Sequence, residues 1–454
     1  MKIYNSMTRQ KEEFIPLDGK NVKMYACGIT VYDLSHIGHA RQAITYAMIA
    51  DYLRYRGYNV KYVRNYTDVD DKIINRANSI GRNALDFSKE QIEETEKDMK
   101  NLHITDANVN ALASENIDNI IKFVEGLIKT GHAYKSETGD VYYDVRSFKE
   151  YGKLSNRNVD DMINGVRKDI EPGKRDPIDF ALWKSAKPGE ISWESPWGKG
   201  RPGWHIECSA MSLKYLGEQF DIHTGGVDHI PTHHENEIAQ SKGRTGKIPA
   251  KTWMHVEFLQ VDNGKMGKSL GNAYTLDQLQ EKGIEPLAYK LFCYTAHYRT
   301  KLNFTFEIAK SSQIAIDRLR NGYLKHLNGT DIINNNIIEE YKKKFLETIN
   351  DDLNIPLAMS IIWEIIKSEK KSKQYAELLL DFDRVLGLDL KNSKKYLESK
   401  EKIQIPEDIK ELIEERKKAR EEKNWQLSDL LRDQIKEKGY IVKDTKEGMT
   451  IDKI

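Results

Sequence analysis

Cysteine, long apolar runs and an excess of charge are scarce or missing in this sequence of 454 residues. The three cysteines, Cys27, Cys208 and Cys293, are odd in number and far apart, which argues against a disulfide framework. No stretch approaches the ~20 consecutive apolar residues of a transmembrane helix. The N-terminus shows no apolar signal core, so we expect a cytoplasmic protein without a membrane partner. The 71 basic and 70 acidic residues leave a net charge of +1, which by itself gives no support for an RNA partner.

What is present is the composition of a globular protein, with 39% hydrophobic and 31% charged residues. The length predicts several domains. Residues 22–26 and 60–63 have the pattern of short strands, and residues 40–55 and 67–78 have the pattern of helices that follow them. This alternation of strand and helix predicts a parallel α/β sheet.

The rest of the chain changes character several times. Residues 117–200 hold a helix, an alternating run of Tyr and Val and a stretch rich in Pro, Gly and Trp, which indicates an insertion between two halves of the sheet domain. From Phe306 to about Leu386, apolar residues recur at helical spacing and predict a helix bundle. Residues 406–438 predict one highly charged helix, and residues 440–451 predict a β-hairpin.

Two histidines stand where a loop leads into the first predicted helix, in His36-Ile37-Gly38-His39. Helix N-termini carry unpaired N–H groups that suit phosphate oxygens, and the imidazoles can donate further hydrogen bonds to a polyphosphate. Gly38 would let a base or ribose lie close to the backbone. The alternative is a helix start with two exposed histidines, and four residues alone do not decide between the two.

A second candidate for phosphate binding is the glycine-flanked loop Lys265-Met266-Gly267-Lys268-Ser269. Lys265 and Lys268 can reach a pyrophosphate from one side and stabilise the charge that develops as it leaves. The alternative is a solvated basic loop. Taken without the other motif, this loop would favour that alternative over phosphate binding.

Histidine, cysteine and glutamate are concentrated in the second half of the predicted sheet domain. Six of the 12 histidines fall between His205 and His255, which is typical of a metal site. His233 and Glu237 are four residues apart and would share a helix face. A zinc-protease motif would need a second histidine where Ile238 stands, so a protease site is not expected.

Together these motifs resemble those of class I aminoacyl-tRNA synthetases, and more narrowly those of the cysteinyl-tRNA synthetase family. The class carries a HIGH motif early and a KMSKS motif after the second half of a Rossmann-type domain, and the order here is the same. The narrower resemblance rests on five strings in the right order, MYACGITVYDLSHIGH, YVRNYTDVDDKI, RPGWHIECSAM, HTGGVDHIPTHHENEIAQ and KMGKSLGN. It departs at Gly267, where the family usually has Ser, and at His229, Pro231 and Thr232, where it usually has Leu, Phe and Pro.

The resemblance implies an α/β fold in which a Rossmann-type parallel-sheet catalytic domain is split by an insertion and followed by an α-helical bundle and a small mixed α/β C-terminal domain. The implied segments are 1–118 for the first catalytic half, 119–200 for the insertion, 201–250 for the second half with the zinc ligands, 251–305 for a stem-contact region with the KMSKS-like loop, 306–395 for the bundle on the anticodon side and 396–454 for the anticodon-recognition domain.

The resemblance also implies the roles of individual residues. The zinc ligands would be Cys27, Cys208, His233 and Glu237, a set that spacing alone cannot assemble because a lone cysteine is more often a small buried apolar group. The catalytic residues would be His36, His39, Lys265 and Lys268, and Gly38 and Ser269 would join them in binding ATP. The cysteine substrate would contact Gly28, Thr67, Trp204 and His223. Alternatives stay open for two of these, since Trp204 could be a core aromatic and Thr67 could cap a helix together with Asp70.

Zinc fits the implied substrate, because it takes a thiolate as ligand readily and a serine hydroxyl much less so, whereas a shaped pocket separates these similar side chains poorly. The implied function is activation of L-cysteine with ATP and Mg²⁺ to cysteinyl adenylate, followed by transfer to tRNA(Cys), by a chain expected to be a monomer with one Zn²⁺.

Two rival functions also fit the sequence. A cysteine ligase that acts on a small amine sugar would share the catalytic domain, but residues 306–454 argue against it. A non-catalytic zinc-containing RNA-binding relative would not need the intact His36, His39, Lys265 and Lys268. The RNA end itself gives thin evidence, since the charged helix has the pattern of a solvated face and Trp425 could stack on a base or pack this helix onto the hairpin.

Overall fold

The computed structural model describes residues 1–160, 172–401, 406–422, 424–445 and 448–453. They form two units, Met1–Ser393 and Lys394–Ile454. Part of the predicted insertion, residues 161–171, lies outside the described residues. The division of the chain into six segments stays a prediction.

A five-stranded sheet with the order β11-β10-β3-β4-β5 forms the centre of the first unit, and all of its neighbouring strands run parallel. Its strands are β3 (Asn21–Ala26), β4 (Asn59–Tyr66), β5 (Val109–Leu112), β10 (Phe220–Gly226) and β11 (Ala250–Val256). All seven residues of β10 are buried, as expected for a central strand covered on both faces. The parallel α/β sheet predicted from the sequence is therefore confirmed.

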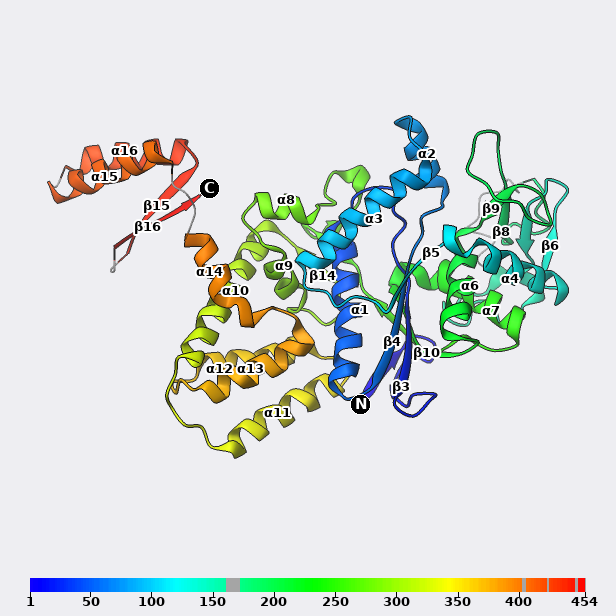
Figure 1. Cartoon of the computed structure of the whole chain (residues 1–454), viewed down its shortest axis with the longest axis horizontal. Coiled ribbons are helices and arrows are strands. Elements are labelled where there is room, and N and C mark those ends of the chain that lie inside the picture. The colour runs from blue at the N-terminus through cyan, green and yellow to red at the C-terminus, as the bar shows by residue number, and fades with distance from the viewer. Residues whose placement is uncertain (161–171, 402–405, 423, 446–447, 454) are drawn as a thin grey trace. The chain divides into compact units, whose positions relative to one another are not determined.

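Helices cover both faces of this sheet. Helix α1 (Ile37–Tyr55) leads from β3 to β4 and packs on one face, whereas α6 (Trp204–Leu216) packs on the other, together with α4 (Ile117–Lys129) and α7 (Glu235–Thr245) (Figure 1). The chain proceeds from β3 to β4 on one side and later returns to place β10 on the other side of β3. Such a reversal opens a crevice at the carboxyl ends of the two strands, where open α/β sheets bind ligands.

The helix predicted at residues 67–78 begins later than expected. Thr67 continues the extended chain, because its N–H donates to the carbonyl of Ile29 at 3.1 Å and its own carbonyl accepts from Val31 at 3.2 Å. Helix α2 is Asp71–Ser79, with Asp70 as its N-cap, and α3 (Ala84–Asn101) follows. The carboxylate of Asp70 accepts from the N–H of Lys72 at 2.8 Å, which supplies the cap that Thr67 does not.

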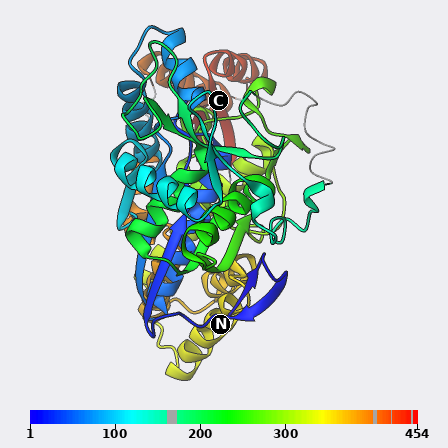
Figure 2. The same ribbon diagram turned by 90° about the vertical axis from the view of Figure 1, so that its right-hand side faces the viewer.

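The insertion builds a sheet of its own, which faces the viewer in Figure 2. The strands are β6 (Ala133–Lys135), β7 (Val141–Tyr143), β8 (Phe180–Ser185) and β9 (Gly200–Pro202), and each pairs antiparallel with the next. Val141, Tyr143 and Trp183 are fully buried and join the core under α4 and α6.

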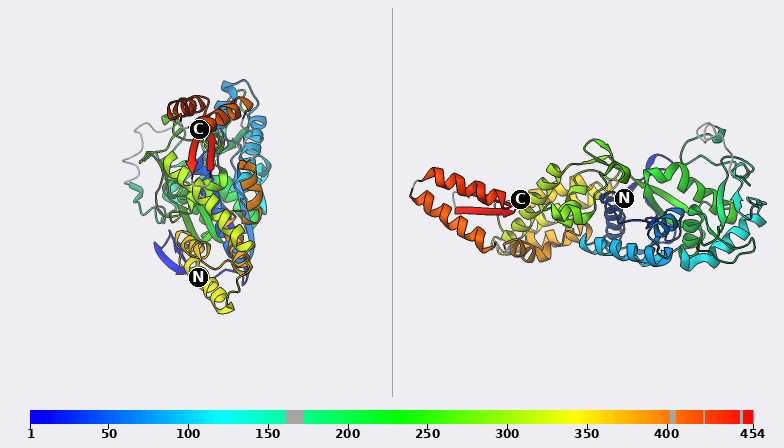
Figure 3. Two further views of the ribbon diagram at one scale, coloured as in Figure 1. Left: turned by 90° about the vertical axis from the view of Figure 1, so that its left-hand side faces the viewer. Right: turned by 90° about the horizontal axis from the view of Figure 1, so that it is seen from above.

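The segment after β11 carries a small sheet and then helices. The sheet has the order β13-β12-β14 and consists of β12 (Leu259–Val261), β13 (Gly264–Lys265) and β14 (Leu302–Phe304). The helices are α8 (Leu276–Glu281), α9 (Pro286–Cys293), α10 (Phe306–Leu327), α11 (Asn335–Asn350), α12 (Ile355–Lys367) and α13 (Lys373–Leu386). A hairpin of β1 (Lys2–Asn5) and β2 (Gln10–Glu13) opens the chain. Seen from above, the helices α10 to α13 and the inserted sheet lie on opposite sides of the parallel sheet (Figure 3).

The second unit is a helix pair with a hairpin. Helix α14 (Ser393–Glu401) leads to α15 (Glu407–Glu421) and α16 (Trp425–Glu437), and β15 (Tyr440–Thr445) pairs antiparallel with β16 (Gly448–Lys453). The single charged helix predicted at 406–438 is thus wrong, whereas the hairpin is confirmed. Asn424 accounts for the break, because its side chain caps α16 through the N–H of Leu427 at 3.2 Å. Among the described residues, no helix is long and apolar enough to cross a membrane.

Candidate active site and metal centre

Helix α1 starts at the carboxyl edge of the sheet with two imidazoles that cap it. Nδ1 of His36 accepts the backbone N–H of His39 at 3.3 Å, and Nδ1 of His39 accepts the backbone N–H of His36 at 3.4 Å. The rings are stacked with their centroids 3.6 Å apart. Because a neutral imidazole that accepts at Nδ1 carries its proton on Nε2, each ring keeps an Nε2–H that can donate to a ligand. Burial, helped by the charge of Lys268, lowers the pKa of His36 to about 4, and burial lowers the pKa of His39 as well, so both rings are neutral at pH 7.

One cavity of about 570 Å³ is lined by both predicted phosphate motifs. Its wall includes His36, Gly38 and His39 from the start of α1, and Lys265 and Met266 from the loop at β13. A Cβ added to Gly38 would lie 2.4 Å from Cε of Met266, so the two motifs approach each other closely. The cavity has the size of a site for a nucleotide-sized ligand.

Lys268 and Ser269 occupy a different position from Lys265. The ammonium of Lys268 forms an ion pair with Asp33 at 2.9 Å, donates to the carbonyl of Leu34 at 3.2 Å and lies 4.6 Å from the ring centroid of Tyr32. Partial burial raises the pKa of Asp33, but the hydrogen bond and charge of Lys268 outweigh it, so that the pKa is lowered. Ser269 is exposed in a short turn after this lysine, and neither residue belongs to the cavity wall.

Gly267 has no steric need to be a glycine. Its φ of −168° is extended backbone, and an added Cβ would meet no atom nearer than Leu270 at 3.7 Å. Asn272 fixes the loop instead, because its Oδ1 accepts the N–H of Gly267 at 2.9 Å and its Nδ2 donates to the carbonyl of Lys265 at 3.1 Å. The loop shape therefore does not depend on which small residue stands at position 267.

The four residues predicted to bind a metal converge from separate segments. Cys27 directly follows β3, Cys208 lies in α6, His233 lies in a π-helical turn (Ile230–His234), and Glu237 lies in the first turn of α7. All four are buried, and their ligand atoms lie within 4.8 Å of one another. Nε2 of His233 is 3.0 Å from Oε1 of Glu237, and Sγ of Cys27 is 3.4 Å from the same oxygen.

The spacing of the two sulfurs fits a tetrahedral zinc site. Sγ of Cys27 and Sγ of Cys208 are 3.7 Å apart, and both cysteines are free. Two thiolates at about 2.3 Å from a tetrahedral ion would be separated by about 3.8 Å, whereas a disulfide would hold them at about 2.05 Å. Two thiols, an imidazole and a carboxylate also form a donor set that zinc accepts.

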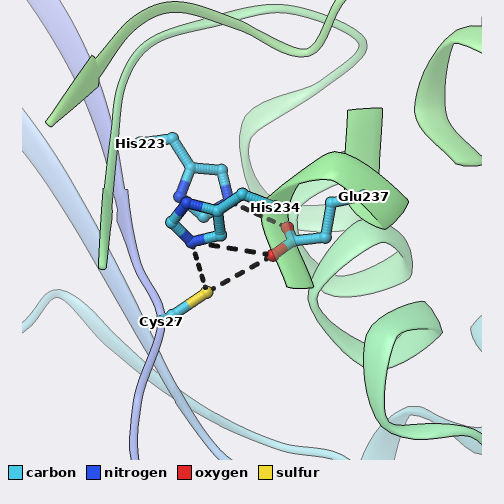
Figure 4. Close-up of side chains that lie close together, drawn as sticks. All are labelled: Cys27, His223, His234 and Glu237. Atoms are coloured by element: carbon cyan, nitrogen blue, oxygen red, sulfur yellow. Dashed lines mark hydrogen bonds and ion pairs between the residues drawn. The ribbon is translucent and has the colours of Figure 1, made fainter. Parts of the chain in front are cut away.

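Two further histidines, His223 and His234, reach the same cluster and form a second possible ligand group with Cys27 and Glu237. Figure 4 shows the imidazoles of His223 and His234 beside Cys27 and the carboxylate of Glu237. Nε2 of His234 is 3.4 Å from Sγ of Cys27, while its Nδ1 is 2.8 Å from Nε2 of His255. Sequence reasoning missed His234 as a possible ligand, because the helical spacing from Glu237 singled out His233. The only available signal was that an i,i+3 pair also shares a helix face.

Charges in this cluster stabilise one another out of contact with water. Burial raises the pKa of Glu237, but the two imidazoles of His223 and His233 outweigh it and lower the pKa strongly. Burial disfavours protonated His233, yet the charges of Glu237 and Cys208 raise its pKa to about 10. Burial also raises the pKa of Cys27. Burial acts in the same direction on Cys208, but the hydrogen bond from Cys27 outweighs it and lowers the pKa of Cys208 to about 6. These shifts favour the ionised forms of Cys208 and Glu237, which are the forms that bind a metal.

The residues predicted to contact the cysteine substrate surround this cluster. Gly28 donates its N–H to Oδ1 of Asn65 at 2.9 Å, and an added Cβ would overlap the carbonyl oxygen of Asn65 at 1.5 Å, so only glycine fits. Trp204 is 37% exposed, which excludes a core role, and its ring centroid is 4.4 Å from that of His233. Nε2 of His223 is 2.8 Å from Oε2 of Glu237.

Thr67 makes a contact that the sequence did not reveal. Its hydroxyl donates to Oε2 of Glu207 at 2.9 Å, and both residues are buried. The alternative in which Thr67 caps a helix with Asp70 is wrong, because Asp70 caps α2 alone. Glu207, next to Cys208 in α6, could not be singled out beforehand because no spacing rule connects it with Thr67.

Comparisons with known proteins give two family matches and several structural neighbours. The profile described as tRNA synthetases class I (C) catalytic domain matches residues 13–313, and that described as cysteinyl-tRNA ligase anticodon binding domain matches residues 404–451. A methionyl-tRNA synthetase of Mycobacterium tuberculosis in complex with methionyl-adenylate is 13% identical, with a TM-score of 0.59 over 82% of this chain and 91% of that one. A LeuRS–tRNA–LeuAMS ternary complex from Agrobacterium radiobacter is 11% identical, with a TM-score of 0.58 over 85% and 86% of the two chains. At these identities the neighbours show a shared fold alone.

Proposed function

The chain belongs to the class I tRNA synthetase family whose catalytic domain is designated (C), and on that premise we propose that it is a cysteine–tRNA ligase. It uses ATP to convert L-cysteine into cysteinyl adenylate and then transfers the cysteinyl group to tRNA(Cys). The observation that carries the proposal is the convergence of Cys27, Cys208, His233 and Glu237 next to a crevice lined by both signature motifs. The match of residues 404–451 to a cysteinyl-tRNA ligase anticodon binding domain supports the choice of amino acid and of tRNA.

The first step joins a carboxylate oxygen of cysteine to the α-phosphorus of ATP, while the bond from that phosphorus to the bridging oxygen of pyrophosphate breaks. Negative charge grows on the phosphate oxygens, and donors already aimed at them stabilise the transition state. The Nε2–H groups of His36 and His39 are such donors, since the helix cap fixes their tautomer. Lys265 supplies a positive charge from the cavity wall. Lys268 lies outside this wall, where it forms an ion pair with Asp33.

The metal cluster would select the amino acid. With Cys27, Cys208, His233 and Glu237 as its ligands, a zinc ion would have to accept the substrate thiolate as an additional ligand, and this would favour cysteine over serine. Around this position, Gly28 lets the backbone of Asn65 approach closely, and the ring of Trp204 lies against that of His233. Mg²⁺ would accompany ATP, as usual for phosphoryl and nucleotidyl transfer.

The second step transfers the cysteinyl group to a ribose hydroxyl at the end of the tRNA and releases AMP. Catalysis of this step would rest on positioning and electrostatics.

The proposal is tested by measuring metal content together with cysteine-dependent ATP–pyrophosphate exchange on the purified chain. We expect one zinc per chain and exchange that depends on cysteine and not on serine. Aminoacylation of tRNA(Cys) transcripts, compared with ligation to an amine sugar, separates the proposal from its nearest rival. A metal-free chain that still prefers cysteine to serine would contradict the role given to the cluster.

Two cysteine variants form a matched pair for this test. Cys208→Ser should lose zinc and reduce exchange by at least about 100-fold, because a serine hydroxyl is a poor zinc ligand. Cys293→Ser should keep both, since Cys293 is buried in α9, outside the metal cluster and the cavity wall. Equal loss in both variants would point to a fold defect rather than to a ligand.

A further inference from the structure

The start of helix α1 is held from outside the helix at Ile37, its first residue. The N–H of Ile37 donates to the carbonyl of Tyr274 at 2.8 Å. Its carbonyl accepts the hydroxyl of Tyr289 at 2.6 Å. Tyr274 follows the loop that carries Lys265 and Lys268, and Tyr289 lies in α9. Two segments that are distant along the chain therefore fix both backbone groups of one residue beside the nucleotide cavity.

The first turn of α1 keeps one backbone donor free for a ligand. His36 and His39 donate their N–H groups to each other's imidazole, and Ile37 donates its own to the carbonyl described above. The N–H of Gly38 forms no hydrogen bond with any residue that the structure describes. Gly38 lines the cavity of about 570 Å³ together with both imidazoles. A free N–H at the positive end of a helix is a donor suited to a phosphate oxygen.

Tyr289 is connected to this N–H through a single peptide unit. The carbonyl of Ile37 and the N–H of Gly38 belong to the same planar amide and point in opposite directions. A hydrogen bond that fixes the carbonyl therefore fixes the direction of the N–H. It also polarises the amide, because successive hydrogen bonds in a chain strengthen one another. A carbonyl oxygen has two lone pairs, so the hydroxyl can bind in addition to the N–H of the next helical turn.

Burial makes the contact of Tyr289 a permanent one. Tyr289 and Ile37 are both fully buried, so no water competes for the hydroxyl. The ring packs against Phe292 and Phe304, with centroids 5.8 and 6.4 Å away. Burial also raises the pKa of Tyr289, and the hydroxyl therefore keeps its proton and remains a donor.

We propose that Tyr289 is a positioning residue for ATP, which aims the N–H of Gly38 at a phosphate oxygen through the carbonyl of Ile37. Tyr289 itself does not belong to the cavity wall, so it acts without touching the nucleotide. The N–H of Gly38 joins the Nε2–H groups of the two imidazoles as a third donor to the phosphates. The inference rests on the proposed function, because the phosphates are those of the ATP used in that reaction.

Tyr289→Phe and Tyr294→Phe form a matched pair that tests the proposal. Each variant removes one hydroxyl and keeps the aromatic ring. Tyr294 directly follows α9, is also buried, and donates its hydroxyl to the carbonyl of Leu386 at 2.8 Å. Because each variant loses one buried hydrogen bond, the two should lose similar stability. The readouts are the calorimetric dissociation constants of ATP with Mg²⁺ and of adenosine, which lacks the phosphates, together with zinc content.

We expect Tyr289→Phe to weaken binding of ATP by about 2- to 10-fold, the range for one neutral hydrogen bond, with adenosine binding and zinc content unchanged. Tyr294→Phe should bind both ligands as the parent does. Unchanged ATP affinity in Tyr289→Phe would overturn the proposal. An equal loss of adenosine affinity would overturn it too, because the hydroxyl would then support the site in general and not a phosphate donor. An equal loss of ATP affinity in both variants would have the same meaning.

These titrations contain no cysteine, which separates the inference from the proposed function. A parent chain that binds ATP but catalyses no cysteine-dependent exchange would overturn the proposed function, and the comparison of the two variants would still decide the role of Tyr289. A parent chain that does not bind ATP would overturn both.

Discussion

At the scale of single residues, His36 and His39 illustrate how helix geometry sets a protonation state. Each Nδ1 is occupied by a backbone N–H of the first helical turn, and this exchange leaves the other nitrogen as donor. The arrangement costs stability in acid, because the folded chain resists protonation of rings that the unfolded chain protonates freely. The ordinary pKa of 6.5 for His36 falls to about 4 in the folded chain. Between these values only the unfolded state binds the proton, so the free energy of unfolding decreases as the pH falls through this range.

The variant His36→Asn isolates this effect, since asparagine keeps a capping oxygen and does not titrate. In the parent, protonation of His36 in the unfolded state should lower the free energy of unfolding by about 1–2 kcal/mol as the pH falls from about 7.5 to about 5. Urea denaturation of the metal-free parent and variant at both pH values measures it. The difference between the two chains should be larger at the lower pH, in favour of the variant. A pH-independent difference would contradict the shifted pKa.

At the scale of elements, the loop of residues 265–269 places Lys265 in the cavity wall and Lys268 in an ion pair with Asp33. The ion pair of Lys268 and Asp33 lies at the surface, with 28% and 43% of the two side chains exposed. Such pairs stabilise by about 0.2–1 kcal/mol, so the lysine is held weakly and can be released by a competing polyphosphate. The ammonium group of Lys268 can therefore pair either with Asp33 or with a bound polyphosphate.

Asp33→Asn removes the competing charge while keeping a side chain of the same size. We expect the KM for ATP in pyrophosphate exchange to fall by about 1.5- to 5-fold, because Lys268 is then free to meet the phosphates. Lys268→Ala provides the contrast, with slower adenylate formation and unchanged zinc content. A marked rise in KM for Asp33→Asn would show that Asp33 assists ATP rather than competing with it.

Elements with strong local patterns could be predicted from the sequence, and contacts across long gaps could not. The parallel strands and α1 follow from apolar runs and helical spacing, and the phosphate motifs follow from short strings with a known chemistry. The start of α2 was misplaced because Thr67 pairs with a distant loop, a tertiary contact that outweighs local propensity. The break at Asn424 was missed because charged residues continue on both sides of it.

The same limit applies to the metal cluster, in which a local pair could be predicted from the sequence and contacts across long gaps could not. His233 and Glu237 form an i,i+4 pair that spacing can find. Cys27 and Cys208 are 181 residues apart in sequence, and only the sheet brings their sulfurs together. His234 competes with its neighbour for the same carboxylate, which no periodicity could reveal.

At the scale of the whole molecule, the two units have separate cores and separate family matches. The second unit packs Ile409, Ile413, Ile435, Tyr440 and Val442 into a cluster of its own. The cavity and the metal cluster are formed entirely by residues of Met1–Ser393. Amino-acid activation should therefore be separable from tRNA recognition.

Deletion of Lys394–Ile454 tests this separation. The shortened chain should keep zinc and cysteine-dependent pyrophosphate exchange, because every residue of the cavity wall remains. Its kcat/KM for aminoacylation should fall by at least about 100-fold, since each lost contact to a base contributes about 1–3 kcal/mol. Loss of exchange in a folded, zinc-loaded truncation would mean that the second unit also supports activation.

The assembly of the cluster across the insertion has a consequence for synthesis on the ribosome. Cys27 precedes Glu237 by 210 residues, so at about 5–20 residues per second it is made roughly 10–40 s before its last partner. During that interval strand β3 lacks its neighbour β10, and the thiol is open to oxidation or to capture by stray metal. Nascent chains arrested before and after residue 237 should accordingly differ in how quickly an alkylating reagent modifies this one sulfur.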